Sequence, residues 1–80
     1  MGEDLKERIF EIVKKQTQID LTKISPEKDF REQVSIDSMQ FVSIVARLEE
    51  ELGIELPISI MEVSTLIEFL SIVDKELQKS

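Results

Sequence analysis

The stretch IDSMQFVSIVARLEEELG, residues 36–53, is the most informative part of this 80-residue chain. It predicts a helix over 37–52, because Asp37 is a favoured N-cap residue and Gln40 stands at the N3 position, as in a capping box. Gly53 fits the position after the last turn, where a left-handed backbone is common. The apolar stripe expected to face inward recurs at helical spacing and consists of Met39, Val42, Val45, Leu48 and Leu52, with Ile44 beside it.

Two further helices are predicted on either side of this segment. The first covers about 3–16, where Leu5, Ile9, Ile12 and Val13 fall on one helical face. The last covers about 65–78 and begins with a capping-box pattern of Thr65 and Glu68. Its apolar residues again have helical spacing: Leu66, Phe69, Leu70, Val73 and Leu77.

The connecting segments are less regular. Residues 17–36 indicate a long loop that apolar side chains fix to the core, because Pro26 disfavours helix just before it. The alternative is that this pattern hides an extra helix. Residues 54–63 indicate one short helix or an apolar connector. The sequence therefore predicts a single all-α domain over 1–80, a bundle of three longer helices and a short one.

Composition disfavours several classes of function. The chain has no His and no Cys, so it lacks the usual general base and the commonest metal ligands. Its net charge of −7 argues against nucleic-acid and anionic membrane partners. No secretory signal and no apolar run of about 20 residues is present, so we expect a cytoplasmic protein. All the net charge lies in 32–80, which is either a solvated surface or a docking face for basic partners.

Ser38 is the main candidate for chemistry. It follows the predicted cap Asp37 and occupies the first position of the helix, where its hydroxyl should be exposed. An anion attached there would lie against free backbone N–H groups and the positive end of the helix dipole, so a phosphodiester on Ser38 is well placed. The alternative is that Asp-Ser is an ordinary capping pair.

The wider pattern carries a family resemblance. Its parts are Ile36-Asp37-Ser38-Met39, then Leu48-Glu49-Glu50-Glu51-Leu52-Gly53-Ile54 at helical spacing, then Leu56-Pro57 and the capped last helix. From about residue 3 to residue 78 the chain resembles the acyl carrier protein family. The resemblance implies a four-helix bundle with a short third helix and a long first loop. It also implies that a phosphopantetheinyl transferase attaches 4′-phosphopantetheine to Ser38, with Asp37 as the motif acid, and that the chain is a non-catalytic, monomeric carrier of acyl thioesters.

The resemblance also implies a surface that contacts partner enzymes. Glu49 and Glu50 match the acidic second helix of the family, and Glu62 matches an acid of its third helix. The chain departs from the pattern elsewhere: Gln40, Ser43, Ile58, Ser59, Ile60 and Met61 occupy positions where acids are usual, and Ser35 replaces a common Gly. We therefore expect a specialised carrier whose partners contact Met39, Phe41, Ile58 and Met61, with Phe41 partly exposed at the edge of the stripe. The alternative is that these side chains line the core or a cavity.

Several functions stay open at this level. The cargo is an acyl group of fatty-acid, polyketide or related lipid biosynthesis, supplied by a loading enzyme and used by synthases or transferases with basic docking patches. Alternatively, it is an aminoacyl or D-alanyl group. A different class is an unmodified helical adaptor that binds basic partners. The largely aliphatic core could also open between its helices to shelter an acyl chain.

Overall fold

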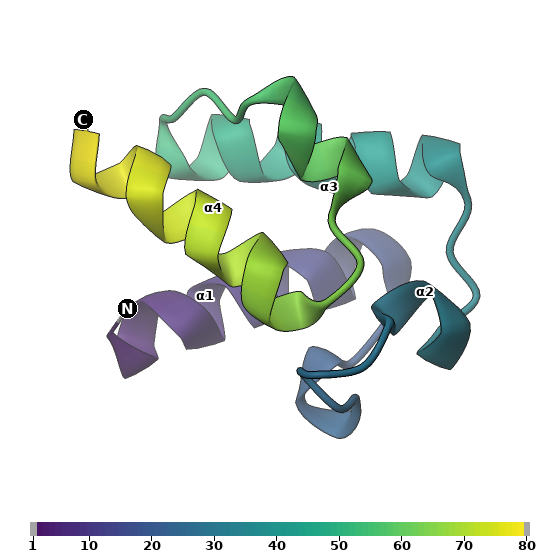
Figure 1. Cartoon of the computed structure of the whole chain (residues 1–80). Coiled ribbons are helices and arrows are strands. Elements are labelled where there is room, and N and C mark those ends of the chain that lie inside the picture. The colour runs from purple at the N-terminus through teal and green to yellow at the C-terminus, as the bar shows by residue number, and fades with distance from the viewer. Residues whose placement is uncertain (1, 80) are drawn as a thin grey trace.

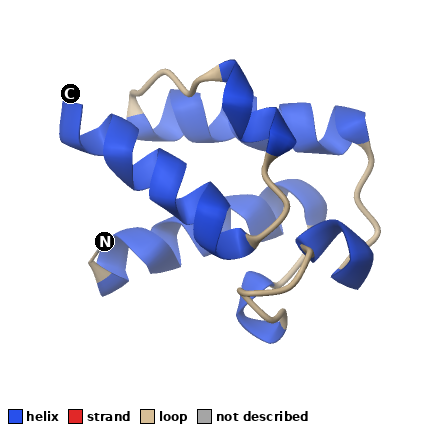
Figure 2. Cartoon of the chain, in the orientation of Figure 1, coloured by secondary structure: helices blue, strands red, loops and turns tan. Residues whose placement is uncertain are grey.

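Three long helices account for most of the fold. In the computed structural model, which describes residues 2–79, the elements are α1 (Glu3–Thr17), η1 (Leu21–Lys23), α2 (Phe30–Gln33), α3 (Ser38–Leu52), η2 (Ile58–Glu62) and α4 (Leu66–Lys79). Helices α1 and α3 pack against each other, and α4 crosses in front of α1 in the view of Figure 1. Figure 2 shows helices joined by loops throughout the described part of the chain, so the predicted all-α bundle is confirmed.

The ends of the long helices follow the local signals in the sequence. Asp37 caps α3 by accepting a hydrogen bond from the Gln40 amide at 2.8 Å, and the Gln40 side chain accepts one from the Asp37 amide at 3.2 Å. Gly53 ends this helix with φ 64°, a left-handed conformation that glycine adopts without steric cost. Thr65 and Glu68 exchange the same reciprocal bonds at the start of α4. Both predicted capping boxes are confirmed.

The segment between α1 and α3 is more ordered than a long loop. It contains the 3₁₀ helix η1 and the single-turn helix α2, so the alternative of an extra helix is confirmed. Asp20 caps η1 by accepting bonds from the hydroxyl and amide of Thr22, and these bonds lower the pKa of the Asp20 carboxyl. Asp29 caps α2 by accepting from the Arg31 amide at 2.8 Å.

Residues 54–65 connect α3 to α4. The predicted short helix is present as the 3₁₀ helix η2. At the end of this segment the Phe30 amide donates to the Ser64 carbonyl at 2.8 Å, and Asp29 and Thr65 form an isolated antiparallel bridge. These backbone bonds attach α2 to the start of α4, so two segments far apart in the sequence form one wall of the bundle.

The core shows that the predicted inward stripe of α3 was right for Ile44, Val45 and Leu48 but wrong for its first two members. The face of α3 that is buried consists of Phe41, Ile44, Val45 and Leu48, whereas Met39 and Val42 are exposed. The helix is therefore rotated relative to the predicted stripe. Apolar residues occur on more than one side of the first turns of α3, so the sequence contains two alternative apolar stripes with helical spacing. The structure buries the face that carries Phe41, whose ring contacts those of Phe30 and Phe69.

No helix among residues 2–79 is both long enough and apolar enough to cross a lipid bilayer.

Candidate functional site

The start of α3 presents Ser38 to solvent. The loop that ends at Asp37 is extended, and the capping box fixes the first turn immediately after it. Asp37 and Gln40 satisfy each other, so neither engages the Ser38 hydroxyl. Ser38 is exposed, and its hydroxyl forms no hydrogen bond to any other described residue. The hydroxyl is therefore free for attachment at the positive end of a helix dipole, as predicted.

A groove of about 430 Å³ opens beside this hydroxyl. The residues that line it come from α2, from the two positions before α3, from the first turns of α3 and from η2. They are Arg31, Ile36, Asp37, Ser38, Phe41, Val42 and Met61. Volumes of this order are typical of small-molecule sites. Most of the lining is apolar, and Arg31 is its one cation.

Arg31 is held across the groove by several contacts. Its guanidinium donates a hydrogen bond to the Met61 carbonyl at 2.7 Å. The same group lies 5.1 Å from the centre of the Phe41 ring and 5.7 Å from that of Phe30, within the range of cation–π interactions. Within residues 2–79 it forms no salt bridge, and Asp37 contributes the one carboxylate of the groove lining.

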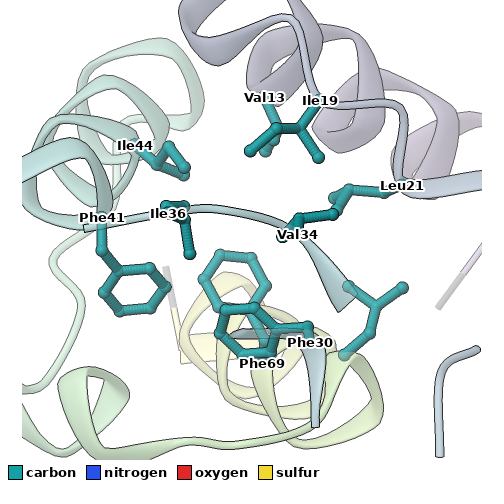
Figure 3. A pocket seen from close by; sticks show the side chains of 10 residues that line it. Val13, Ile19, Leu21, Phe30, Val34, Ile36, Phe41, Ile44 and Phe69 are labelled. Carbon is teal, nitrogen blue, oxygen red and sulfur yellow. The ribbon is translucent and has the colours of Figure 1, made fainter. Parts of the chain in front are cut away.

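A second, much smaller space lies between the helices and the first connection and is not enclosed. This cavity has a volume of about 30 Å³ and only apolar lining: Val13, Ile19, Leu21, Phe30, Val34, Ile36, Phe41, Ile44, Leu66 and Phe69. Figure 3 shows these side chains converging from the helices and from the first connection, with the rings of Phe30, Phe41 and Phe69 gathered on one side. Ile36 and Phe41 line both the cavity and the groove.

The apolar residues expected to contact partners have different fates. Met39 and Ile58 are strongly exposed, at 81% and 89% of their full surface, and Met61 is half-buried at the groove. The expectation for Phe41 was wrong: only 4% of its surface is exposed, because its ring packs against those of Phe30 and Phe69. Phe41 therefore presents no surface for a docked partner.

The acidic residues also differ in what they do. Glu49 is half-buried, and its carboxylate accepts a hydrogen bond from the Leu56 amide at 2.8 Å. Glu51 pairs with Arg47 at 3.0 Å. Glu50 and Glu62 are exposed, and their side chains form no hydrogen bond or salt bridge with another residue among 2–79. Glu50 and Glu62 thus leave their charges available on the surface, whereas Glu49 stabilises the connector after α3.

Two features of this region were missed from the sequence. Arg31 was counted only in the charge balance, since nothing local indicates that residue 31 reaches residues 38 and 61. Val42 was assigned to the core, but it is about half exposed and lines the groove. Val42 lies two residues, about 200° around the helix, from the buried Ile44, so the two side chains cannot share one buried face, and this spacing was a usable signal. Among residues 2–79 there is no cluster of side chains suited to a metal ion.

The comparisons with known proteins agree with this geometry. The family described as "Phosphopantetheine attachment site" matches residues 7–73. The acyl carrier protein of Rubrobacter xylanophilus is 33% identical over 66 residues, which cover 82% of each protein. The chain belongs to the acyl carrier protein family. The acyl carrier protein of Thermosynechococcus vestitus is 37% identical over 54 residues, which cover 68% of this chain and 67% of that protein.

One relative is considerably longer. The mitochondrial acyl carrier protein 2 of Arabidopsis thaliana is 33% identical over 54 residues, which make up 68% of this chain but only 43% of the plant protein. The similarity to it therefore covers the carrier region and less than half of that protein's length.

The residues near Ser38 fit the prosthetic group of the acyl carrier proteins. Members of this family carry 4′-phosphopantetheine, which joins the protein through a phosphodiester. The exposed Ser38 hydroxyl can accept such a link without any rearrangement of the capping box. The guanidinium of Arg31 lines the same groove and suits a negatively charged diester, although Asp37 also lines it.

Proposed function

We propose that Ser38 is the residue that carries 4′-phosphopantetheine and that this chain passes acyl groups between enzymes without catalysing a reaction itself. The observation that supports this most directly is the exposed hydroxyl at the first position of α3, unpaired within the described residues and beside an open groove. When bound, the group supplies a terminal thiol that holds acyl cargo as a thioester, which a chain without Cys cannot provide for itself.

The chain's own residues hold and present the attachment point. Asp37 fixes the backbone before Ser38 through the capping box, so the hydroxyl has a defined direction. No carboxylate or amide in residues 2–79 forms a hydrogen bond with the hydroxyl that could activate it. The base that removes its proton is therefore proposed to come from the phosphopantetheinyl transferase.

The partner surface is proposed to combine exposed apolar side chains with free acids. Met39 lies beside Ser38 on α3, and Ile58 projects from η2. Glu50 and Glu62 add negative charge that would guide enzymes with basic docking patches. Glu49 and Met61 are weaker candidates because both are half-buried. Because few acids lie near Ser38, dedicated partner enzymes are favoured over a broad set of partners.

The pathway is proposed at a coarse level. Fatty-acid, polyketide or related lipid biosynthesis agrees with the names of the three relatives described above, which are acyl carrier proteins. An aminoacyl or D-alanyl carrier is the second candidate, because apolar residues surround the serine. The mass of the protein purified from its native host, with cargo attached, separates the two.

The cytoplasm is the proposed compartment. A chain without Cys suits a reducing environment. Because one relative is named as mitochondrial, fractionation of the native host is the appropriate test.

Intact-mass measurement tests the assignment of Ser38. Purified protein is incubated with coenzyme A and a phosphopantetheinyl transferase. We expect the wild type to gain the mass of one arm and Ser38→Ala to gain none. Ser43→Ala is the matched control, because Ser43 is also exposed on α3, and it should gain the arm fully. Modification of the Ser38→Ala variant would refute the site, and an unmodified wild type would leave the helical adaptor as the better interpretation.

A further inference from the structure

Two surface spaces flank the first turns of α3. The groove described above lies on the side of α2 and η2, has a volume of about 430 Å³ and contains the cation Arg31. A hollow of about 190 Å³ lies on the side of α1, and its lining consists of Gln16, Thr17, Asp37, Met39, Gln40 and Ser43. The residues that line this α1-side hollow include no cation. An arm attached to Ser38 therefore has two unlike spaces within which to lie.

Asp37 contributes a carboxylate to both spaces. Its repulsion of a negatively charged diester on Ser38 acts on either side of α3 and so favours neither. One of its oxygens also accepts the hydrogen bond from the Gln40 amide, which offsets part of its charge. Among the lining residues, the charge that distinguishes the groove from the α1-side hollow is that of Arg31.

The guanidinium of Arg31 is already oriented in the groove. It donates a hydrogen bond to the Met61 carbonyl at 2.7 Å and lies 5.1 Å from the centre of the Phe41 ring. These contacts come from η2 and α3, so they fix the group without placing it in an ion pair. The bond to Met61 uses one of its five N–H groups, and the others can donate to an anion. A guanidinium that is fixed beforehand loses little conformational freedom when it binds a phosphate.

From these observations we propose that Arg31 is a positioning residue whose guanidinium binds the phosphodiester on Ser38 and directs the arm into the groove, away from the α1-side hollow. Arg31 makes and breaks no covalent bond in this role. It selects the side of α3 on which the arm lies, and the arm is thereby presented to partner enzymes beside η2. The inference rests on the proposed attachment at Ser38.

Nuclear Overhauser effects in the wild type test the direction of the arm. Close to its phosphate the arm carries two methyl groups on one carbon, and these report where its first part lies. Val42 and Met61 line the groove and not the hollow, whereas Thr17 lines the hollow and not the groove. We expect contacts from the arm methyl groups to those of Val42 and Met61 and none to that of Thr17. Contacts to Thr17, or none to either groove residue, would overturn the inference.

Variants at position 31 test the guanidinium. Arg31→Met keeps an unbranched apolar stem without the charge, and we expect the contacts to Val42 and Met61 to be lost. Arg31→Lys keeps the charge and should retain part of them.

Arg8→Met is the matched control for these variants. Arg8 also donates from its guanidinium to a distant carbonyl, that of Glu51 at 3.1 Å, but it does not line the groove. Its replacement should leave the wild-type contacts in place. Unchanged contacts in a folded Arg31→Met protein that carries the arm would refute the role of Arg31.

The Nε–H signal of Arg31 gives a second measurement that needs no variant. In the wild type this signal is compared between the protein without the arm and the protein that carries it. We expect the Arg31 signal to shift and that of Arg8 to stay unchanged. An unshifted Arg31 signal would overturn the inference even where Arg31→Met fails to fold.

Mass spectrometry of every sample separates the inference from the proposed function. A wild-type protein that never gains the arm refutes both. A protein that carries the arm on Ser38 but shows an unshifted Arg31 signal refutes the inference alone.

Discussion

The two ends of α3 use polar side chains in opposite ways. At the N-terminal end, Asp37 and Gln40 bind each other and leave Ser38 free. At the C-terminal end, Glu49 and Glu51 are both engaged, one with the Leu56 amide and the other with Arg47. Acids at a helix C-terminus oppose the helix dipole, so they gain from such contacts. The Ser38 hydroxyl is left unpaired because the polar groups of its neighbours Asp37 and Gln40 bind each other. A run of acids, by contrast, is not in itself a surface available to partners, because its members can be engaged in contacts within the protein.

Removal of the N-cap of α3 should reduce the stability of the protein more than the other changes proposed below. Asp37→Ala deletes the acceptor for the Gln40 amide, and we expect a loss of about 1 kcal/mol in unfolding free energy. For a domain of this size that corresponds to a fall of about 4–8 °C in the midpoint of thermal unfolding. Asp37→Asn keeps an acceptor oxygen and should lose much less. Equal midpoints for Asp37→Ala and the wild type would show that the capping box does not hold the N-terminal end.

Glu49 and Glu50 form a matched pair of neighbours. Glu49→Ala leaves the part-buried Leu56 amide without its acceptor, and we expect a loss of slightly under about 1 kcal/mol because the site is partly hydrated. Glu50→Ala should change stability by less than about 0.5 kcal/mol, as for ordinary surface substitutions. Urea unfolding measures both.

The same pair sharpens the proposal for the partner surface. Binding of a basic partner enzyme should weaken more in Glu50→Ala than in Glu49→Gln, which retains the acceptor oxygen for Leu56. Equal stability losses in the two alanine variants would contradict the distinction between an engaged and a free acid.

The ion pair at the C-terminal end should contribute least. Arg47 and Glu51 are four residues apart and partly exposed, so the coupling energy is expected to be about 0.3–0.5 kcal/mol and to decrease with added salt. A double-mutant cycle with Arg47→Gln and Glu51→Gln measures it. A coupling energy that does not change with salt would indicate that the pair is more shielded from water than its exposure suggests.

The sequence predicted the long helices well because their signals are local. The predicted limits of α1, α3 and α4 lie within one residue of the observed ones. For α3 and α4 the reason is that capping boxes and Gly53 act over three or four residues. Ser38 was identifiable for the same reason, as the residue directly after a cap. These signals depend on neighbours along the chain and need no knowledge of the tertiary fold.

The remaining features depend on contacts between distant residues. The rotation of α3 depends on Phe41 meeting Phe30 and Phe69, and no single-helix pattern contains that information. Helix α2 has only one turn, and its position depends on the bond from the Phe30 amide to Ser64. The groove itself exists only because folding places residue 31 beside residue 61.

The aromatic cluster also makes the molecule its own optical reporter. The chain has four Phe and neither Trp nor Tyr, and three of those rings are Phe30, Phe41 and Phe69. Near-ultraviolet circular dichroism of the unlabelled protein therefore reports mainly on the packing of these rings. Their rearrangement during loading or docking can be followed in solution without adding a dye.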